Sequence, residues 1–458
     1  MVRLFQVYYP VRTLVLLIGE ALLACASFLL ATLIVFRQDS VLVLNYEYGF
    51  YKVLALTGIV ILCSHFFDLY GISRLGLKGE IYVRVFLALG ALSFVLAGIE
   101  YAVPRLVPGH GVLLLSLVIL TFVIPSWRMG FLWMLRKPFL KERVYVIGGG
   151  PLATELVETI RDRNDLGMEI VGWVGAIGDA SLTRDDIGRK LQTIMKEQGV
   201  SHVIVALSDR RGKMPTRDLL DLRLSGIKVE EAGTVLEKVS GKIQVDALHP
   251  STLVFAEGFR LNQGLLIVRR IVSLLVALII LICALPLIPF IVLAIKLSSP
   301  GPVLFKQERV GRNGESFFLY KFRTMVQDAE ARSGPTWAFD NDPRVTAVGR
   351  FMRSARLDEI PQLWNVLKGD MGFVGPRPER PEFVQWLNNA IPYYQLRHVI
   401  RPGITGWAQV RYKYGASVED SNQKLQYDLY YVKHMSLALD LVIMFETVKT
   451  ILMARGSR

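Results

Sequence analysis

The segment Ile271–Ile295 reads IVSLLVALIILICALPLIPFIVLAI, and it decides how the chain is divided between membrane and water. It is an unbroken apolar run of the length that crosses a bilayer, for which about 20 residues suffice. Pro286 and Pro289 interrupt this run, and a proline inside a helix removes a backbone donor and bends the helix. The segment therefore predicts two membrane-embedded helical pieces with a break between them.

Basic residues flank this run on both sides. Arg269 and Arg270 precede it, and Lys296 follows it directly. Because lysine and arginine favour the cytoplasmic side of a membrane, both ends are expected in the cytoplasm. We predict a re-entrant membrane helix over 267–297 that enters the bilayer and returns. The alternative is an ordinary fifth span, which would place the rest of the chain outside the cytoplasm.

Four further apolar stretches lie before this segment, at 13–36, 53–68, 82–103 and 112–135. They predict four transmembrane helices within 1–140, and the basic residues in the loops place the N-terminus and everything after 136 in the cytoplasm. Glu20 falls inside the first stretch, and an ionisable side chain there is expected to face other helices rather than lipid.

The composition agrees with a membrane protein. The 458 residues are 52% hydrophobic and carry a formal net charge of +13. Because basic residues flank apolar segments, this charge favours lipid headgroups or phosphate-bearing substrates over nucleic acid. The three cysteines each lie in an apolar run, and the six histidines show no metal-ligand spacing, so the sequence indicates neither a disulfide framework nor a zinc site.

Residues 141–250 alternate between strand and helix patterns, which predicts a parallel sheet covered by helices and hence a Rossmann-like α/β domain. A linker is expected over 251–264. The predicted strands are Arg143–Gly148, Glu169–Gly175, His202–Leu207 and Ile227–Glu231, and the predicted helices are Leu152–Arg163, 185–198 and 215–225.

A glycine-rich turn, Gly148-Gly149-Gly150-Pro151, follows the first of these strands. It fits the dinucleotide-binding pattern, so Gly148 and Gly150 are candidate cofactor-binding residues. The acidic residue that would bind the ribose is missing at the end of the second strand, because the nearest, Asp179, lies beyond it. A glycine turn also serves plain tight packing, and this alternative stays open.

The region after 297 begins with a basic segment. Ser298–Met325 reads SSPGPVLFKQERVGRNGESFFLYKFRTM and contains five basic and two acidic residues. Val303–Lys306 and Phe317–Phe322 are predicted strands, joined by a turn at 311–314. Such a hairpin suits a membrane surface or a phosphate site, although a solvated basic face is the alternative.

The densest chemical signal is Leu357–Glu379, which reads LDEIPQLWNVLKGDMGFVGPRPE. Asp358 and Glu359 stand just before Pro361, which is tolerated only in the first turn of a helix, and Gly369 is placed to end that helix. Both carboxylates are therefore expected at a helix N-terminus, where an ionised carboxylate is favoured and can act as a nucleophile toward phosphorus. Simple helix capping is the alternative.

Arg377 lies between Pro376 and Pro378, so its backbone has little freedom to lose on binding, and its planar guanidinium matches two phosphate oxygens. A rigid arginine after paired carboxylates indicates a site for a diphosphate and a divalent metal. A second arginine followed by proline, Arg401, opens a turn and short strand ending at Val410. Asp428 lies on a predicted helix.

The final stretch, Leu437–Met453, is apolar with charges interspersed, and it predicts an amphipathic helix lying on the membrane.

These motifs together resemble the polyprenyl-phosphate hexose-1-phosphate transferases, the monotopic phosphoglycosyl transferases of bacterial polysaccharide assembly. The match covers 265–458, and the whole chain resembles the large form of the family. The resemblance implies a membrane α plus α/β fold: four transmembrane helices, a Rossmann-like domain and a mainly helical monotopic catalytic domain with a re-entrant helix. It implies a multi-pass protein of the bacterial inner membrane, with the catalytic domain on the cytoplasmic face.

The resemblance also implies an activity. Asp358 would attack the sugar-bearing phosphorus of a UDP-sugar and release UMP, and a polyprenyl phosphate would then take the phosphosugar from Asp358. Mg²⁺ would be held by Asp358 and Glu359. Phosphates would be bound by Lys321, Arg323, Arg377 and Arg401, and Asp428 would complete the polar site. Such enzymes initiate exopolysaccharide, capsule or O-antigen synthesis, and the large forms tend to dimerise.

One departure from the family pattern concerns Ser273. The family often has an aspartate at this place, just after the basic pair that opens the re-entrant helix, so the local anchoring of that helix is in question.

Two other classes of function are considered. The chain could be a membrane-tethered nucleotide sensor or scaffold that acts through the Rossmann-like domain, or an NAD-dependent membrane oxidoreductase. Tight NAD(H) binding that is lost on changing Gly148 or Gly150 would favour either one. The missing acidic residue at the strand end counts against the oxidoreductase.

Overall fold

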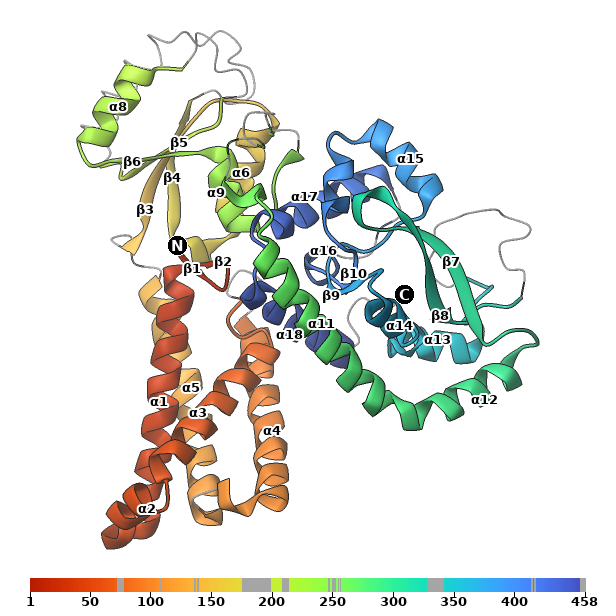
Figure 1. The fold of residues 1–458 in the computed structure, drawn as a ribbon. Helices are drawn as coiled ribbons and strands as arrows, with labels where there is room; N and C mark the ends of the chain where they lie inside the picture. The colour runs from red at the N-terminus through yellow and green to blue at the C-terminus, as the bar shows by residue number, and fades with distance from the viewer. Residues whose placement is uncertain are drawn as a thin grey trace. The chain divides into compact units, whose positions relative to one another are not determined.

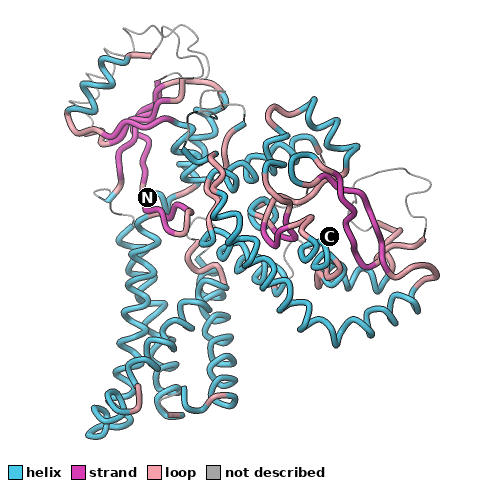
Figure 2. The backbone as a smooth tube through the Cα atoms, in the orientation of Figure 1, coloured by secondary structure: helices cyan, strands magenta, loops and turns pink. Residues whose placement is uncertain are grey.

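The computed structural model describes residues 1–71, 78–106, 109–135, 137, 140–174, 199–207, 214–245, 248, 253, 255, 257–327, 342–412, 415 and 417–453. The chain forms two compact units, and each is described by itself. The first contains residues 1–2 and 8–235, and the second contains residues 3–7 and 236–458. Figure 2 shows that helices make up most of the backbone.

The first unit contains the long apolar helices that the sequence predicts near the N-terminus (Figure 1). By length and composition alone, four helical segments here are able to cross a membrane: Val11–Tyr46, Gly49–Phe66, Tyr82–Ala102 and His110–Leu135. The number of membrane crossings itself stays a prediction. The helices are α1 (Val11–Phe36), α2 (Ser40–Tyr46), α3 (Gly49–Phe66), α4 (Lys78–Ala102) and α5 (His110–Leu135).

Glu20 of α1 faces other helices, as its charge requires. Its side chain is fully buried and forms an ion pair of 2.5 Å with Arg128 of α5. The Ser64 hydroxyl of α3 donates a hydrogen bond of 2.8 Å to the same carboxylate. A buried carboxylate is tolerated only when its charge and its lone pairs find such partners, so this network ties three of the helices together.

The α/β part of the first unit is a parallel four-stranded sheet with the order β4-β3-β5-β6. All four predicted strands are confirmed within one or two residues, because β-branched residues fill their buried positions. The predicted helix over 185–198 lies outside the described residues. The elements are β3 (Glu142–Ile147), α6 (Pro151–Asp162), β4 (Met168–Val174), β5 (His202–Val205), α8 (Thr216–Leu224) and β6 (Lys228–Glu231).

Gly148 and Gly150 lie in the turn between β3 and α6. Both have positive φ angles, 117° and 91° respectively, which disfavour residues with a Cβ. A Cβ on Gly148 would also lie 2.5 Å from the carbonyl group of Ala206, so close packing alone requires glycine there. Nucleotide binding by this turn stays a prediction.

The boundary between the two units falls after Val235, inside the region 141–250 that the sequence assigns to one domain, and within helix α9 (Ala232–Ser240). The N-terminal strands β1 (Val2–Leu4) and β2 (Val7–Tyr9) form a separate two-stranded sheet.

In the second unit, the apolar segment forms α11 (Gln263–Ala284) and α12 (Ile288–Ser298), joined by a 3-10 turn at Leu285–Leu287. The predicted break is therefore present at Pro286, and Figure 1 shows the two helices running in different directions on either side of it. The whole segment is long and apolar enough to cross a membrane by length and composition, so the re-entrant course stays a prediction.

The N-terminal half of α11 is anchored to residues 366–373. Ser273 Oγ accepts a hydrogen bond of 3.2 Å from the backbone N–H of Phe373. The Arg270 guanidinium donates to the carbonyl oxygens of Val366 and Leu367, the latter at 3.0 Å. Ser273 therefore provides the local anchoring that its departure from the family pattern put in question.

The remaining elements of the second unit follow this pair of helices in the chain. They are β7 (Leu304–Val310), β8 (Ser316–Phe322), α13 (Ala347–Ser354), α14 (Gln362–Lys368), β9 (Gly372–Val374), α15 (Pro381–Ala390), β10 (Gly403–Thr405), α16 (Trp407–Arg411), α17 (Val418–Lys433) and α18 (Leu437–Leu452).

Two expectations for this unit need correction. The first hairpin strand is longer than predicted, because β7 pairs with β8 along its full length up to Val310. The strand predicted to end at Val410 stops at Thr405, and Trp407–Arg411 is helical instead. Trp407 is buried and its indole N–H donates to Gly241 at 2.8 Å, so a tertiary contact overrides the local strand preference.

Helix α18 buries charged residues and exposes apolar ones. Asp440 and Lys449 are buried, whereas Leu441, Val448 and Leu452 are exposed. These two charged residues therefore face the protein together with the buried Leu439 and Ile443, and the other side of the helix exposes apolar side chains. Such a side could lie on a membrane, which stays a prediction.

Candidate functional site

The carboxylates Asp358 and Glu359 lie in a 3-10 turn, Leu357–Glu359, just before α14. Arg356 introduces this turn with a left-handed backbone, at a φ of 56°, and Gly369 ends α14 at a φ of 108°. Neither carboxylate caps a helix, because the turn and α14 have no side-chain capping bond. The capping alternative is therefore wrong, and the end of the helix at Gly369 is confirmed.

Both carboxylates are buried, with 7% of Asp358 and 8% of Glu359 exposed. An ionised carboxylate is costly to bury unless cations or hydrogen-bond donors surround it. The two residues meet this requirement very differently.

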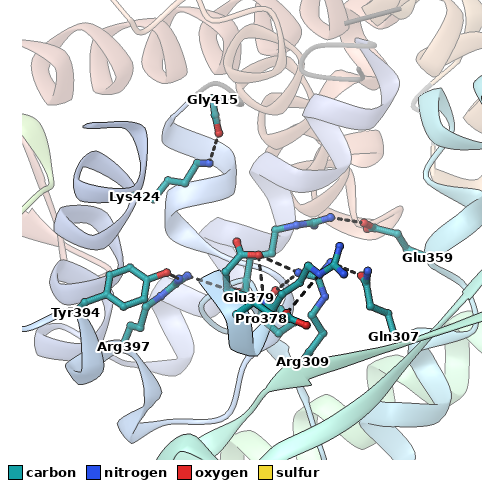
Figure 3. Close-up of polar contacts among 12 residues, drawn as sticks. Gln307, Arg309, Glu359, Pro378, Glu379, Tyr394, Arg397, Gly415 and Lys424 are labelled. Carbon is teal, nitrogen blue, oxygen red and sulfur yellow. Dashed lines mark hydrogen bonds and ion pairs between the residues drawn. The ribbon is translucent and has the colours of Figure 1, made fainter. Parts of the chain in front are cut away.

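Glu359 is enclosed by three cations that all approach the oxygen Oε1. Arg377 Nη2 lies at 3.1 Å, Lys321 Nζ at 3.4 Å and Arg356 Nη1 at 3.7 Å. Figure 3 draws Glu359 and one of these contacts. Burial raises the pKa of Glu359, but the charges of Arg377 and Lys321 outweigh it and hold that pKa well below the ordinary value.

Asp358 has no such partner. Among the described residues, none forms a hydrogen bond or an ion pair with its side chain. Burial raises the pKa of Asp358, and the neighbouring Glu359 charge raises it further, while Lys321, Arg377 and Arg353 act in the opposite direction at longer range. Among the described residues, Asp358 is thus the carboxylate of the pair whose oxygens have no hydrogen-bond or ion-pair partner.

Lys321 reaches this site because β8 is fixed to α14. Asn365 of α14 is fully buried; its amide donates to the Phe318 carbonyl at 2.7 Å, and its Oδ1 accepts from the Tyr320 N–H at 3.1 Å. The side-chain amide thus replaces a neighbouring strand for two backbone groups of β8. Lys321, the next residue, is four-fifths buried, and burial lowers its pKa.

Arg377 reaches the site through the parallel pair β9 and β10. Gly372 pairs with Gly403 and Val374 pairs with Thr405. A Cβ on Gly375 would lie 2.5 Å from the Arg401 carbonyl oxygen, so the two segments approach too closely for any other residue.

Behind Arg377 lies a buried network that the sequence did not indicate. Arg397 is 6% exposed, and its Nη2 donates to the Arg377 carbonyl oxygen at 3.0 Å. The same nitrogen lies 2.8 Å from Asp428 Oδ2, and Nη1 donates to the Tyr394 hydroxyl at 2.5 Å. Figure 3 shows Arg397 directed away from Glu359, beside Tyr394.

The predicted site residues therefore separate into two groups. Lys321 and Arg377 meet at Glu359 beside Asp358. Asp428 instead pairs with Arg397, Arg323 Nη2 donates to the Ser299 carbonyl at 2.7 Å, and the Arg401 guanidinium forms no ion pair among the described residues.

Additional basic side chains lie beside the Pro-Arg-Pro segment. Arg309 of β7 contacts Glu379 at 3.0 Å and donates to the Pro378 carbonyl at 3.2 Å, and Lys424 of α17 donates to the Gly415 carbonyl at 2.6 Å (Figure 3). Lys424 is near enough to Arg377 and Arg397 to interact electrostatically, and burial lowers its pKa. The surroundings of the carboxylate pair are thus strongly basic.

Four cations lie around the two carboxylates: Lys321, Arg353, Arg356 and Arg377. The site is therefore net positive and suited to an anion that carries more than one charge. Arg353 and Arg356 were missed, although both lie within five residues before the pair and a count of nearby basic residues could have found them. Arg397 and Asn365 had no such local signal.

A metal site with several protein ligands is not found in the described part of the chain, where no three His, Cys, Asp or Glu side chains are grouped to hold an ion. A carboxylate pair still fits Mg²⁺, which in phosphate-transfer sites takes one or two carboxylates together with substrate oxygens.

Comparison with known proteins gives a consistent result. Residues 265–454 match the family described as "Bacterial sugar transferase". The chain is 42% identical over 243 residues, 53% of its length and 56% of the relative, to the UDP-N-acetylgalactosamine-undecaprenyl-phosphate N-acetylgalactosaminephosphotransferase of Aeromonas hydrophila. It is 33% identical over 325 residues, 69% of its length and 60% of the relative, to the undecaprenyl-phosphate glucose phosphotransferase of Komagataeibacter xylinus.

The chain thus spans less than two thirds of the length of these two relatives. A longer match is the UDP-glucose:undecaprenyl-phosphate glucose-1-phosphate transferase of Escherichia coli (strain K12), at 33% identity over 334 residues, which covers 70% of each chain. The match to this relative extends well beyond the region 265–454. The chain therefore belongs to the bacterial sugar transferase family.

Proposed function

We propose that this protein transfers a sugar-1-phosphate from a UDP-sugar to undecaprenyl phosphate. The observation on which this rests is a buried carboxylate pair beside four cations, in which Asp358 forms no hydrogen bond or ion pair among the described residues. A net positive site favours a diphosphate, and a carboxylate beside it that has no ion-pair partner among the described residues is available as a nucleophile. The relatives are named for transfer to undecaprenyl phosphate, which supports the lipid acceptor.

In the first step, an Asp358 carboxylate oxygen attacks the phosphorus that bears the sugar. The bond from this phosphorus to the oxygen that bridges the two phosphates breaks, and UMP leaves with that oxygen and its electron pair. Arg377 and Lys321 hold the phosphate oxygens and stabilise the developing negative charge. The product is an acyl phosphate on Asp358.

In the second step, an oxygen of the lipid phosphate attacks the same phosphorus. The acyl phosphate bond breaks, the Asp358 carboxylate is regenerated and the sugar leaves on a lipid diphosphate. Each step forms one bond to phosphorus and breaks one, so no other reactant is required. Dividing the transfer in two lets one basic site serve both substrates in turn.

Asp358 and Glu359 would hold Mg²⁺ together with substrate phosphates. The ion would neutralise phosphate charge and orient the diphosphate. The chain's own residues still have to supply the nucleophile and the cations that bind the phosphates.

The decisive experiment is UMP release by the purified full chain in detergent. The assay contains undecaprenyl phosphate, Mg²⁺ and a panel of UDP-sugars that includes UDP-glucose and UDP-N-acetylgalactosamine. We expect UMP with at least one sugar and transfer of radiolabelled sugar phosphate to the lipid. Asp358→Asn should abolish both, and full turnover by this variant would refute the proposal.

We propose further that catalysis occurs at the cytoplasmic face of the bacterial inner membrane, with α11 and α12 as a re-entrant pair, and that the protein forms a homodimer. Two features support the first part: the helix break at Leu285–Leu287 and the outward apolar face of α18. The Rossmann-like sheet would then be an accessory domain. A nucleotide sensor acting through Gly148 and Gly150 is the alternative; NAD(H) or nucleotide binding lost on Gly148→Ala, without UMP release, would favour it.

A further inference from the structure

The three cations at Glu359 come from separate parts of the chain. Lys321 belongs to β8, Arg356 precedes the 3-10 turn, and Arg377 follows β9, yet all three approach the same carboxylate oxygen. The side chain of Lys321 is 20% exposed and that of Arg377 is 40% exposed. Arg377 is therefore open to a ligand while it contacts Glu359.

The donors that would bind a substrate phosphate are already occupied by Glu359. Under the proposed function, Lys321 and Arg377 must turn their N–H groups toward phosphate oxygens. In the structure the same groups are directed at a carboxylate, which offers the same kind of acceptor with the same sign of charge. A phosphate and Glu359 consequently compete for the same donors.

We propose that Glu359 is an internal stand-in for a substrate phosphate, an inference that rests on the proposed function. In the resting protein Glu359 holds Lys321, Arg356 and Arg377 in a preorganised cluster. Its negative charge offsets the repulsion among these three positive charges. A diphosphate then takes over some of these contacts. The ligand class is a phosphate or diphosphate of a nucleotide, and the contact with Glu359 lowers its affinity in exchange for a ready-made site.

Asp358 provides a matched control. It is equally buried and carries the same charge one residue away, but its side chain forms no hydrogen bond or ion pair among the described residues, and the cations act on it only at longer range. A general charge effect predicts that removal of either carboxylate tightens anion binding to a similar extent. A stand-in predicts that only changes at Glu359 do so strongly.

The test is equilibrium binding of UDP to the full chain, measured by calorimetry in detergent with EDTA. Glu359→Gln should bind UDP more tightly than the wild type, on the order of ten-fold, because a charged contact that competes with the ligand is lost. Asp358→Asn should differ from the wild type by less than about three-fold, because this carboxylate forms no ion pair with the cations and a charge interaction weakens with distance.

Glu359→Asp is the second variant. It keeps the net charge but is one methylene too short to reach all three cations, so it should also bind UDP more tightly than the wild type. It keeps the test possible if Glu359→Gln fails to fold. Thermal melting and gel filtration check that each variant is folded.

The inference is overturned if both Glu359 variants bind UDP as the wild type does or more weakly, or if Asp358→Asn tightens binding as much as Glu359→Gln. These results leave the proposed function intact when the wild type still releases UMP. Absence of UDP binding in the wild type and in every variant would overturn this inference alone, whereas absence of UMP release by the wild type with Mg²⁺ present would overturn the proposed function together with it.

Discussion

Arg397 connects Asp428 to the main chain of Arg377. One guanidinium nitrogen lies 2.8 Å from Asp428 Oδ2 and donates to the Arg377 carbonyl oxygen at 3.0 Å. Asp428 was predicted to complete the polar site, but its charge is used to orient Arg397. The backbone of Arg377, the predicted phosphate-binding arginine, is therefore held by a hydrogen bond from a buried ion pair as well as by the prolines on either side of it.

Asp428→Asn should weaken both stability and substrate binding. The variant leaves the Arg397 charge buried without its partner, and loss of one member of a buried pair costs about 3 kcal/mol. We expect a lower midpoint of thermal unfolding and a KM for UDP-sugar that rises more than kcat falls, because Asp428 positions Arg377 without touching the reacting atoms. Arg397→Lys should show the same split.

Glu382→Gln is the control for that experiment. Glu382 is 58% exposed and its pair with Arg380 is 3.7 Å long, so its loss should change stability by less than about 0.5 kcal/mol. A fall in kcat for Asp428→Asn with KM unchanged would contradict a positioning role.

Asn365→Leu should loosen β8 and displace Lys321. The substitution leaves the Phe318 carbonyl and the Tyr320 N–H without their partner, and each unsatisfied buried group costs about 1–3 kcal/mol. Thermal unfolding in detergent and UDP binding measure the two effects. Lys368→Gln, on the exposed side of the same helix, should leave the unfolding temperature and UDP binding near their wild-type values. Wild-type values of both quantities in Asn365→Leu would contradict the role of Asn365 in holding β8.

The sequence indicates what is local and misses what is long-range. Pro286 marks the helix break and Gly369 marks the end of α14, because each acts on its own backbone. The contact between Lys321 and Glu359 joins residues 38 positions apart, and that between Arg397 and Asp428 depends on how α17 packs. A single sequence has no periodicity or spacing that reports such contacts, so Arg397 and Asn365 could not be found.

The two adjacent carboxylates should affect stability in opposite directions. The pKa of Glu359 is lowered by its cations, so its ionised form stabilises the fold. The pKa of Asp358 is raised by burial and by Glu359, so ionising Asp358 costs stability at neutral pH. In EDTA at pH 7, Glu359→Gln should therefore unfold at a lower temperature than the wild type, and Asp358→Asn at a higher one.

The pH dependence follows from the direction of the Glu359 shift. A carboxylate with a lowered pKa contributes stability that is complete above its pKa in the unfolded chain, about 4.3, and is lost as the pH falls further. The difference in unfolding temperature between the wild type and Glu359→Gln should therefore be constant at neutral pH and shrink below about pH 4. A difference that grows on acidification would contradict the ion-pair assignment.

The course of α11 and α12 can be tested by labelling from either side of the membrane. In a chain whose cysteines at 25, 63 and 283 are replaced by serine, Gln263→Cys and Leu297→Cys place one thiol at each end of the apolar segment. A re-entrant pair keeps both ends on the cytoplasmic face. A membrane-impermeant maleimide should therefore label both positions in inside-out vesicles and neither in spheroplasts.

Tyr101→Cys is the matched control, because this residue is 92% exposed at the end of α4, where the loop charges predict the opposite face. It should be labelled in spheroplasts. Labelling of Leu297→Cys in spheroplasts together with Tyr101→Cys would show that the segment crosses the bilayer. The carboxylate pair, which follows α12 in the chain, would then lie on the side where UDP-sugars are not made, and the break at Pro286 would be only a kink in a spanning helix.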